Sequence, residues 1–346
     1  MELRFSLPCA WRGARSKLGR MRLHFLILLA VSLNCGAAEP RGGGQPTVYQ
    51  GMADASAAVT VGTNFFIVAD DEDNHLRLYH RHRPGAPIKS FDLTEFLEVK
   101  GRFLEADIEG GARIGNRAFW IGSHGRNRVG KERFNRCRLF ATDIAGEGES
   151  VTLTPVGRPY TNLLEDLTKD PRLSQFRLSR AARRAPKEAG ALNIEGLAAT
   201  PGGGLLIGFR NPIPNAQALL VPLLNPNEVV FGATPRLGAP IQIDLGGLGV
   251  RDLIHFEGSY LILAGPFHER GPFRLYRWEE GSLRPEIIPS SDFGDAHPEA
   301  VLVYPDTGLR EIQILSDDGT QLVNGSPAKQ TSDRQKRSFR SFWVVP

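Results

Sequence analysis

The sequence contains little cysteine. Its three cysteines are Cys9, Cys35 and Cys137, and the first two lie in an N-terminal segment with the features of an export signal. A single remaining cysteine cannot form a disulfide within one chain, so an internal disulfide is excluded even in an oxidising compartment. The stability of the mature protein must therefore come from packing.

Long hydrophobic runs are also missing. The apolar stretch near the N-terminus covers residues 23–33, which is too short to cross a bilayer as a helix. Arg20 and Arg22 precede this stretch and small residues follow at 36–38, which is the arrangement of a secretory signal peptide. We therefore expect residues 1–38 to be a signal peptide and the mature protein to be secreted or periplasmic, without stable membrane insertion.

Two boundaries follow from the export signal. Met21 alone would give a signal of ordinary length, so it is an alternative start of the chain. Residues 39–46 are rich in glycine and proline and are expected to form a linker. A single domain is then expected over residues 47–346.

Outside the expected signal peptide, residues 1–38, the chain has no excess of basic charge. The chain has 42 Lys and Arg against 38 Asp and Glu, but residues 1–38 hold six of the basic residues and one of the acidic ones. The rest of the chain carries 36 basic and 37 acidic residues, and this balance argues against a nucleic-acid partner. We expect a monomer that binds an anionic small molecule or a protein ligand.

A repeated unit runs through the mature sequence. Each copy has an acidic or polar residue, a short apolar strand, a turn and a second apolar strand. The residues at the shared register position are Ser56, Glu109, Glu195, Asp252 and Glu299. Their intervals of 53, 86, 57 and 47 residues are close to the spacing of propeller blades. The repeat predicts an all-β protein, a β-propeller of five four-stranded blades, with six blades or an unrelated mixed β fold as alternatives.

The longest interval and the two ends of the domain need separate explanations. The interval of 86 residues contains leucines at helical spacing that are interrupted by Pro171, which predicts a helical insertion near residues 160–187. Residues 339–345 read as the last strand, and residues 47–50 can pair with it. Such pairing closes the ring of blades and leaves no open sheet edge.

Several motifs resemble those of a family of exported bacterial proteins that has β-propeller character and no assigned function. The stretches that carry the resemblance are Gly122-Ser-His-Gly-Arg-Asn-Arg128, Asn193-Ile-Glu-Gly-Leu-Ala-Ala-Thr-Pro-Gly202, Gly208-Phe-Arg-Asn-Pro212, Pro298-Glu-Ala-Val301 and Leu315-Ser-Asp-Asp-Gly319. The segment Glu195-Gly-Leu-Ala198 is more distantly similar to phytase-like esterase propellers and to gluconolactonase-type calcium propellers. Those resemblances imply a propeller fold, but the chain lacks the dense run of aspartates of the calcium-bound phosphoesterases.

Four carboxylates are expected to surround the propeller axis, because the first strand of each blade lines the central channel. Glu109, Glu195, Asp252 and Glu299 are therefore candidate ligands for Ca²⁺, which accepts six to eight oxygen ligands. The alternative is structural, with each carboxylate accepting hydrogen bonds from the backbone of the next blade. Without a cation, mutual repulsion would keep a proton on one carboxylate, which makes Glu109 and Glu195 candidate catalytic acids.

A basic loop follows one of the predicted inner strands. Arg126, Arg128 and Lys131 lie on this glycine-punctuated loop and could clamp an oxyanion, and His124 on the same loop is a candidate for acid–base catalysis. Further candidate substrate-binding residues near the same channel mouth are Arg210, Asn211 and Arg251. The alternative is that the arginines form buried ion pairs with the acidic ring and bind nothing.

Two functions remain open from the sequence. The first is a hydrolase of an anionic ester, a phosphoester or a lactone, in which bound Ca²⁺ polarises the substrate. The second is a non-catalytic module that binds a ligand or a protein. A serine hydrolase is unsupported because the sequence has no Gly-x-Ser-x-Gly motif.

Overall fold

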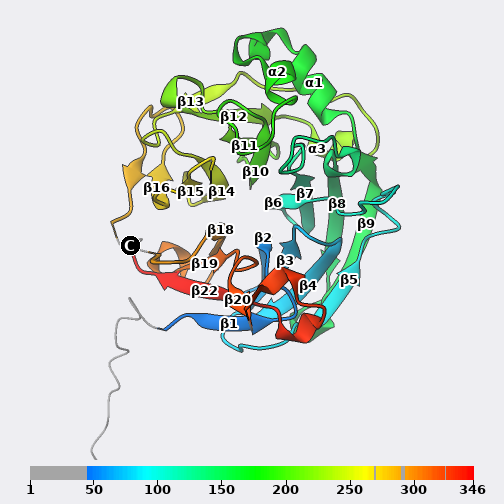
Figure 1. Ribbon diagram of the computed structural model, residues 1–346. Helices are drawn as coiled ribbons and strands as arrows, with labels where there is room; N and C mark the ends of the chain where they lie inside the picture. Colours follow the sequence, from blue (N-terminus) through cyan, green and yellow to red (C-terminus); the bar gives the residue numbers. More distant parts are fainter. Residues whose placement is uncertain (1–44, 269, 290–292, 324) are drawn as a thin grey trace, which may run out of the picture. The chain divides into compact units, whose positions relative to one another are not determined.

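The computed structural model describes residues 45–268, 270–289, 293–323 and 325–346. In these residues, five four-stranded antiparallel sheets form the blades of a β-propeller (Figure 1). The all-β class and the five-blade prediction are therefore confirmed. The predicted signal peptide lies outside the described residues. Within the described part of the chain, no helix is long and apolar enough to cross a membrane.

Four of the blades are built from consecutive strands, with the innermost strand first. The first blade consists of β2 (Ala55–Val61), β3 (Phe65–Asp70), β4 (His75–His80) and β5 (Lys89–Asp92). The second consists of β6 (Ile108–Ile114), β7 (Arg117–Gly122), β8 (Leu139–Ala145) and β9 (Thr152–Tyr160). The third consists of β10 (Asn193–Ala199), β11 (Leu205–Asn211), β12 (Ala218–Leu223) and β13 (Ile241–Ile243). The fourth consists of β14 (Gly249–Phe256), β15 (Ser259–Gly265), β16 (Arg274–Trp278) and β17 (Glu286–Ile287).

The fifth blade joins the two ends of the domain. Its strands are β18 (Pro298–Val303), β19 (Ile312–Ser316), β22 (Ser338–Val344) and β1 (Thr47–Gln50). Strand β1 pairs antiparallel with β22, with Thr47 opposite Ser341 and Gln50 opposite Ser338. The closing pair predicted from the sequence is confirmed, and it covers the edge of β22 that would otherwise be free. A short hairpin, β20 (Leu322–Val323) and β21 (Ser326–Pro327), lies between β19 and β22.

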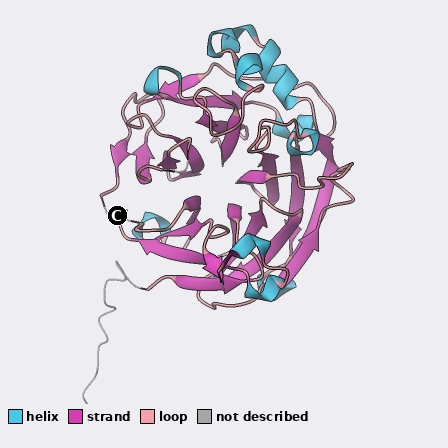
Figure 2. Ribbon diagram, in the orientation of Figure 1, coloured by secondary structure: helices cyan, strands magenta, loops and turns pink. Residues whose placement is uncertain are grey.

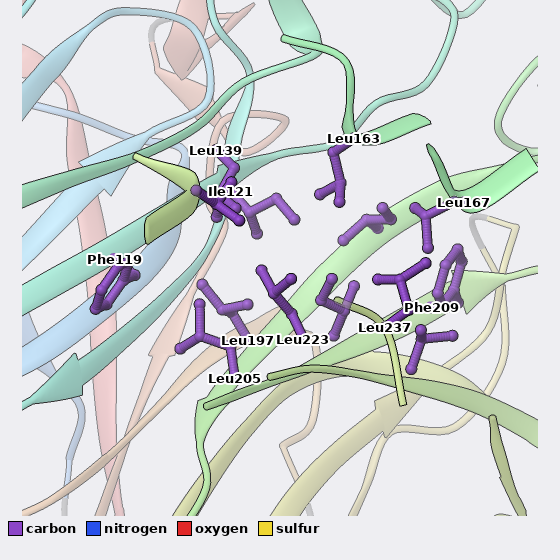
Figure 3. Packing of buried hydrophobic residues seen from close by; sticks show 14 of the residues in the cluster. Phe119, Ile121, Leu139, Leu163, Leu167, Leu197, Leu205, Phe209, Leu223 and Leu237 are labelled. Carbon is purple, nitrogen blue, oxygen red and sulfur yellow. The ribbon is translucent and has the colours of Figure 1, made fainter. Parts of the chain in front are cut away.

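The hydrophobic core is divided among the five interfaces between neighbouring blades. Successive side chains of a strand point to opposite faces of its sheet, so each blade supplies two neighbouring interfaces. Phe119 and Ile121 pack against the third blade, whereas Ala118 and Trp120 pack against the first. Figure 3 shows the interface between the second and third blades, where Phe119 and Ile121 lie near Leu197 and Leu205. Packing of this kind fixes the blades around the axis.

The helical insertion predicted near residues 160–187 is present. It consists of α1 (Leu163–Lys169), the 3₁₀ helix η3 (Pro171–Phe176) and α2 (Leu178–Ala181), which follow β9 and precede β10 (Figure 2). Leu163 and Leu167 are fully buried and extend the core between the second and third blades (Figure 3). Another short helix, α3 (Pro226–Val229), follows β12. The insertion is thus anchored by its apolar side chains.

Candidate functional site at the propeller axis

Each innermost strand begins with a β-bulge. The extra residue that has no partner on the neighbouring strand is Ser56, Glu109, Glu195, Arg251 or Glu299 in the successive blades. A bulge re-aims the side chain that it carries and is common next to functional sites. In the fourth blade the register position predicted at Asp252 is wrong by one residue, because Arg251 is the extra residue there. The ring therefore contains one arginine among its acidic members.

Arg251 connects the third, fourth and fifth blades. Its Nη1 lies 3.1 Å from Oε2 of Glu195, and its Nη2 contacts Oε1 of Glu299. Oε1 of Glu195 accepts hydrogen bonds from Arg210 Nη1 at 2.7 Å and from Asn193 Nδ2 at 2.6 Å. Burial, and then the charge of Arg210, lowers the pKa of Arg251 to about 10. In this half of the axis, ion pairs therefore link the charged side chains into one network.

The other half of the axis is acidic and comes from the first and second blades. Asp71 directly follows β3, Asp107 directly precedes β6, and Glu109 lies on β6. One carboxylate oxygen from each of these three residues lies within 4.8 Å of the other two. A second group with the same spacing contains Asp54, Asp71 and Glu72, so Asp71 belongs to both. These oxygens suit a hard cation such as Ca²⁺ or Mg²⁺.

Asp71 is the most crowded of these carboxylates. Burial raises its pKa well above the ordinary value, and neighbouring acidic charges raise it further. Those neighbours are, in decreasing order of effect, Asp54, Glu109, Asp317 and Asp107. The pKa of Glu109 is raised well above its ordinary value by burial and then by Glu195, which places Glu109 between the acidic half and the ion-pair network. Carboxylates packed in this way share protons or require a cation.

Asp54 provides a separate indication that the acidic cluster favours a cation. The residue is 3% exposed, and within the described residues its Oδ2 has no hydrogen-bond partner. Burial, followed by the charge of Asp317, raises the pKa of Asp54 to about 9. Lys329 lies 3.7 Å from Asp54 Oδ1 but forms its closer contact, 2.6 Å, with Glu72. A Cβ at Gly319 would overlap the carboxylate of Asp54, so only glycine leaves room for it.

The four carboxylates predicted as metal ligands are not equivalent. Glu109 lies in the acidic cluster, whereas Glu195 and Glu299 are ion-paired with Arg251. Asp252 accepts hydrogen bonds from the backbone N–H of Val301 and of Leu253, both at 2.8 Å. Its position matches the structural alternative, in which a carboxylate binds the backbone of the next blade. Of the predicted four, Glu109 alone belongs to a described group with metal-ligand spacing.

The basic side chains predicted to clamp an anion are not directed toward the acidic cluster. Arg126 donates hydrogen bonds to the carbonyls of Ala182 and Gly130 and to the carboxylate of Glu132, while Arg128 and Lys131 are not buried. Asn211 is also occupied, because its amide donates to the carbonyls of Pro186 and Glu188. Of the predicted anion-binding residues, Arg210 and Arg251 are the two with ion pairs to Glu195.

His124 is buried on the same loop. Its Nδ1 lies 2.8 Å from the carbonyl oxygen of Gly122, which makes Nδ1 the protonated nitrogen and leaves Nε2 as an acceptor. Burial lowers the pKa of His124 to about 4, so the side chain is neutral at neutral pH. It can accept a proton only at acidic pH, which weakens its case as a general base.

Asp54, Asp71 and Asp107 were not among the site residues predicted from the sequence. A signal for Asp71 was present, since Asp70 ends the second strand of its blade and Asp71 directly follows, much as Arg210 and Asn211 end the second strand of the third blade. A signal for Asp107 was its alternation with Glu109 at the start of an inner strand. Asp54 had no such signal, because it joins the cluster from the segment between β1 and β2.

A family model described as "Protein of unknown function (DUF3616)" matches residues 54–139 and 147–291, which confirms the resemblance to a family of unknown function. No curated protein matches the chain.

Among solved structures, the chain is similar to the glutaminyl cyclase of Myxococcus xanthus, with 13% identity over 88% of this chain and 96% of that one and a TM-score of 0.44. It is also similar to a GH43_1 enzyme from Xanthomonas citri, with 10% identity over 88% and 91% of the two chains and a TM-score of 0.46. A putative oxidoreductase (glucose dehydrogenase) from Thermus thermophilus shows 14% identity over 87% of this chain and 100% of that one, with a TM-score of 0.38.

Proposed function

The chain belongs to DUF3616, a family of proteins of unknown function, and we propose from its axial site that it is a metal-dependent hydrolase of an anionic ester. The expected ion is Ca²⁺, and the expected substrate is a phosphoester or a lactone with a charged group. The observation that carries this proposal is the position of Asp71, a carboxylate surrounded by four acidic neighbours. A divalent cation would relieve that repulsion without any rearrangement of the fold.

The carboxylates of Asp71, Asp107 and Glu109 are the residues that would hold the ion. Their oxygens converge from two blades, and because Ca²⁺ accepts six to eight oxygen ligands, water and substrate would have to supply the others. Arg136 Nη1 lies 2.8 Å from Asp107 and fixes the orientation of that carboxylate. Asp54 would contribute charge beside Asp71 and hold the ion electrostatically. A bound divalent ion supplies Lewis acidity toward an ester or phosphoryl oxygen and lowers the pKa of a coordinated water.

The neighbouring arginines favour an anionic substrate once an ion is present. The acidic residues of the axis outnumber the basic ones, so the cluster without an ion would repel an anion. With the ion bound, Arg251 and Arg210 would stabilise charge that develops on the substrate. Glu109 lies between the acidic cluster and these arginines, so the ion that it helps to hold would lie near the groups that bind the charge of the substrate.

Ion binding is the first test of the proposal. Protein treated with EDTA is expected to melt about 5 °C higher when Ca²⁺ is added at roughly 100 times its Kd, since binding to the folded state alone adds about 2.7 kcal/mol. The variant Asp71→Asn should melt higher than wild type in EDTA, because one repelling charge is gone, and should not respond to Ca²⁺. Differential scanning fluorimetry with Ca²⁺, Mg²⁺ and Mn²⁺ measures both effects.

The matched control is Glu286→Gln, which removes a carboxylate from the exposed edge strand β17. This variant should respond to the ion as wild type does, whereas Glu109→Gln should not. The ion site is wrong if none of the three ions changes the melting temperature, or if Asp71→Asn retains the full shift.

Hydrolysis requires a separate measurement. We expect wild-type protein with Ca²⁺ to hydrolyse at least one member of a panel of phosphomonoesters, phosphodiesters and lactones. EDTA and Asp71→Asn should each abolish the activity, and Glu286→Gln should keep it. A second candidate, a non-catalytic binding module, is favoured by the ion pairs that occupy Arg210 and Arg251. It would be supported by a protein that binds the ion and hydrolyses no member of the panel.

We also propose that the protein works outside the cytoplasm, as its N-terminal sequence indicates. Calcium sites of extracellular modules have weak affinities, with Kd on the order of 10⁻⁴–10⁻³ M. A site with three protein carboxylates, one of them ion-paired with Arg136, is compatible with affinity in that range.

A further inference from the structure

A cavity separate from the acidic cluster lies between the basic loop and the helical insertion. Its volume is about 720 Å³. One side is formed by residues of the loop between β7 and β8, and the other by residues of α1, α2 and the segments that flank them. Cavities of this size accommodate small organic ligands. None of the carboxylates in the two metal-spaced groups belongs to its lining.

The cavity carries a surplus of positive charge. Four arginines and two glutamates line it, and each glutamate already has a partner: Glu132 pairs with Arg126 and Glu165 pairs with Lys169. Arg183 has no side-chain hydrogen bond or ion pair with the described residues. Arg133 has a carboxylate only at 4.0 Å, on Glu105. Its Nη1 donates a hydrogen bond of 3.0 Å to the carbonyl of Glu132, and its buried Nε lacks a hydrogen-bond partner in the described part of the chain. Guanidinium groups whose N–H donors are not all used within the protein can bind an anion.

Apolar groups lie beside these arginines. Leu164 of α1 and Ala182, which follows α2, line the cavity, and so does Phe134 with 75% of its surface exposed. The guanidinium carbon of Arg133 lies 3.9 Å from the ring centroid of Phe103, which is 46% exposed. His124 contributes a neutral imidazole to the same lining. Exposed aromatic side chains around a cavity often mark a binding site.

We propose that this cavity is a binding site for an organic anion with an apolar body. The anionic end is held by Arg183 and Arg133, and the apolar body lies between Leu164 and Phe134. The site requires no metal ion, so it is independent of the axial chemistry. It also gives the helical insertion a role, because α1 and α2 supply the wall that a regular blade would lack.

The probe for this site is 8-anilinonaphthalene-1-sulfonate, and its matched control is the neutral N-phenyl-1-naphthylamine. In EDTA, the sulfonate is expected to bind with 1:1 stoichiometry and at least about tenfold more tightly than the neutral compound. Arg183→Glu should weaken binding of the sulfonate by about tenfold or more and leave the neutral compound unaffected. Fluorescence titration and calorimetry measure these affinities.

Two further variants separate the cavity from the rest of the surface. Ser179 is an exposed lining residue, so Ser179→Trp should fill the cavity without disturbing the core and abolish binding of both compounds. Arg180, exposed on the same helix but outside the lining, provides the control Arg180→Glu, which should bind as wild type. Circular dichroism checks that each variant is folded. The proposal is overturned if the sulfonate does not bind, or if Arg183→Glu and Ser179→Trp bind it as wild type does.

Discussion

Replacing Arg251 with methionine is expected to lower the free energy of unfolding by about 3–5 kcal/mol. Arg251 is 4% exposed and contacts Glu195 and Glu299, so its removal leaves Glu299 in the interior without its ion-pair partner and leaves Glu195 paired with Arg210 alone. Methionine fills a similar volume, and the loss therefore reports charge and not an empty cavity. Equilibrium denaturation in urea, followed by tryptophan fluorescence, measures the change.

Two companion variants test this explanation. Arg274→Met removes an exposed arginine from β16 and should change stability by less than about 0.5 kcal/mol. The double variant with Arg251→Met and Glu299→Gln should recover most of the loss, because Glu299 is then neutral and Glu195 keeps Arg210 as its partner. A double variant as unstable as the single one would show that shape, and not charge, determines the effect.

The fold was predictable because propeller blades repeat a pattern of short apolar strands and turns. Continuous apolar strands such as β7 and β15 bury both faces, which distinguishes them from the half-exposed strands of a single sheet. The closing strand was predictable for a different reason: a ring needs a partner for its last edge, and residues 47–50 were the remaining strand. The insertion could be found because it lengthened one interval of the repeat.

The site was less predictable because register decides which side chain reaches the axis. The bulge in β14 makes Arg251 the extra residue and leaves Asp252 bonded to the backbone, a difference of one position that the spacing of the repeat does not encode. Asp54 lies in the segment between β1 and β2, and Asp71 lies just after the end of β3. Their proximity therefore depends on how neighbouring blades pack. The basic loop turned out to contact the insertion, which sequence spacing alone could not show.

Tyr49 packs β1, the strand that closes the ring, against the first blade. Its ring is fully buried and lies 5.2 Å from the ring of Phe339 in a stacked arrangement, with Phe66 and Tyr79 at its edges. Its hydroxyl donates a hydrogen bond of 2.6 Å to the carbonyl of Arg81. The aromatic group therefore joins β1, β3, β4 and β22, the strands on either side of the point where the ring closes.

Removal of this side chain should consequently open the ring at the seam where β1 pairs with β22. We expect Tyr49→Ala to lower the free energy of unfolding by about 3–5 kcal/mol, through lost burial and the cavity that remains. Tyr49→Phe, which keeps the ring and loses the hydroxyl, should cost about 1 kcal/mol, and Val48→Ala, at a half-exposed position of the same strand, less than about 0.5 kcal/mol. In Tyr49→Ala, amide hydrogen exchange should quicken first in β1 and β22, because these strands are released before the other four blades unfold. Equal exchange rates in all five blades would mean that the ring does not open at this seam and that the propeller unfolds as one unit.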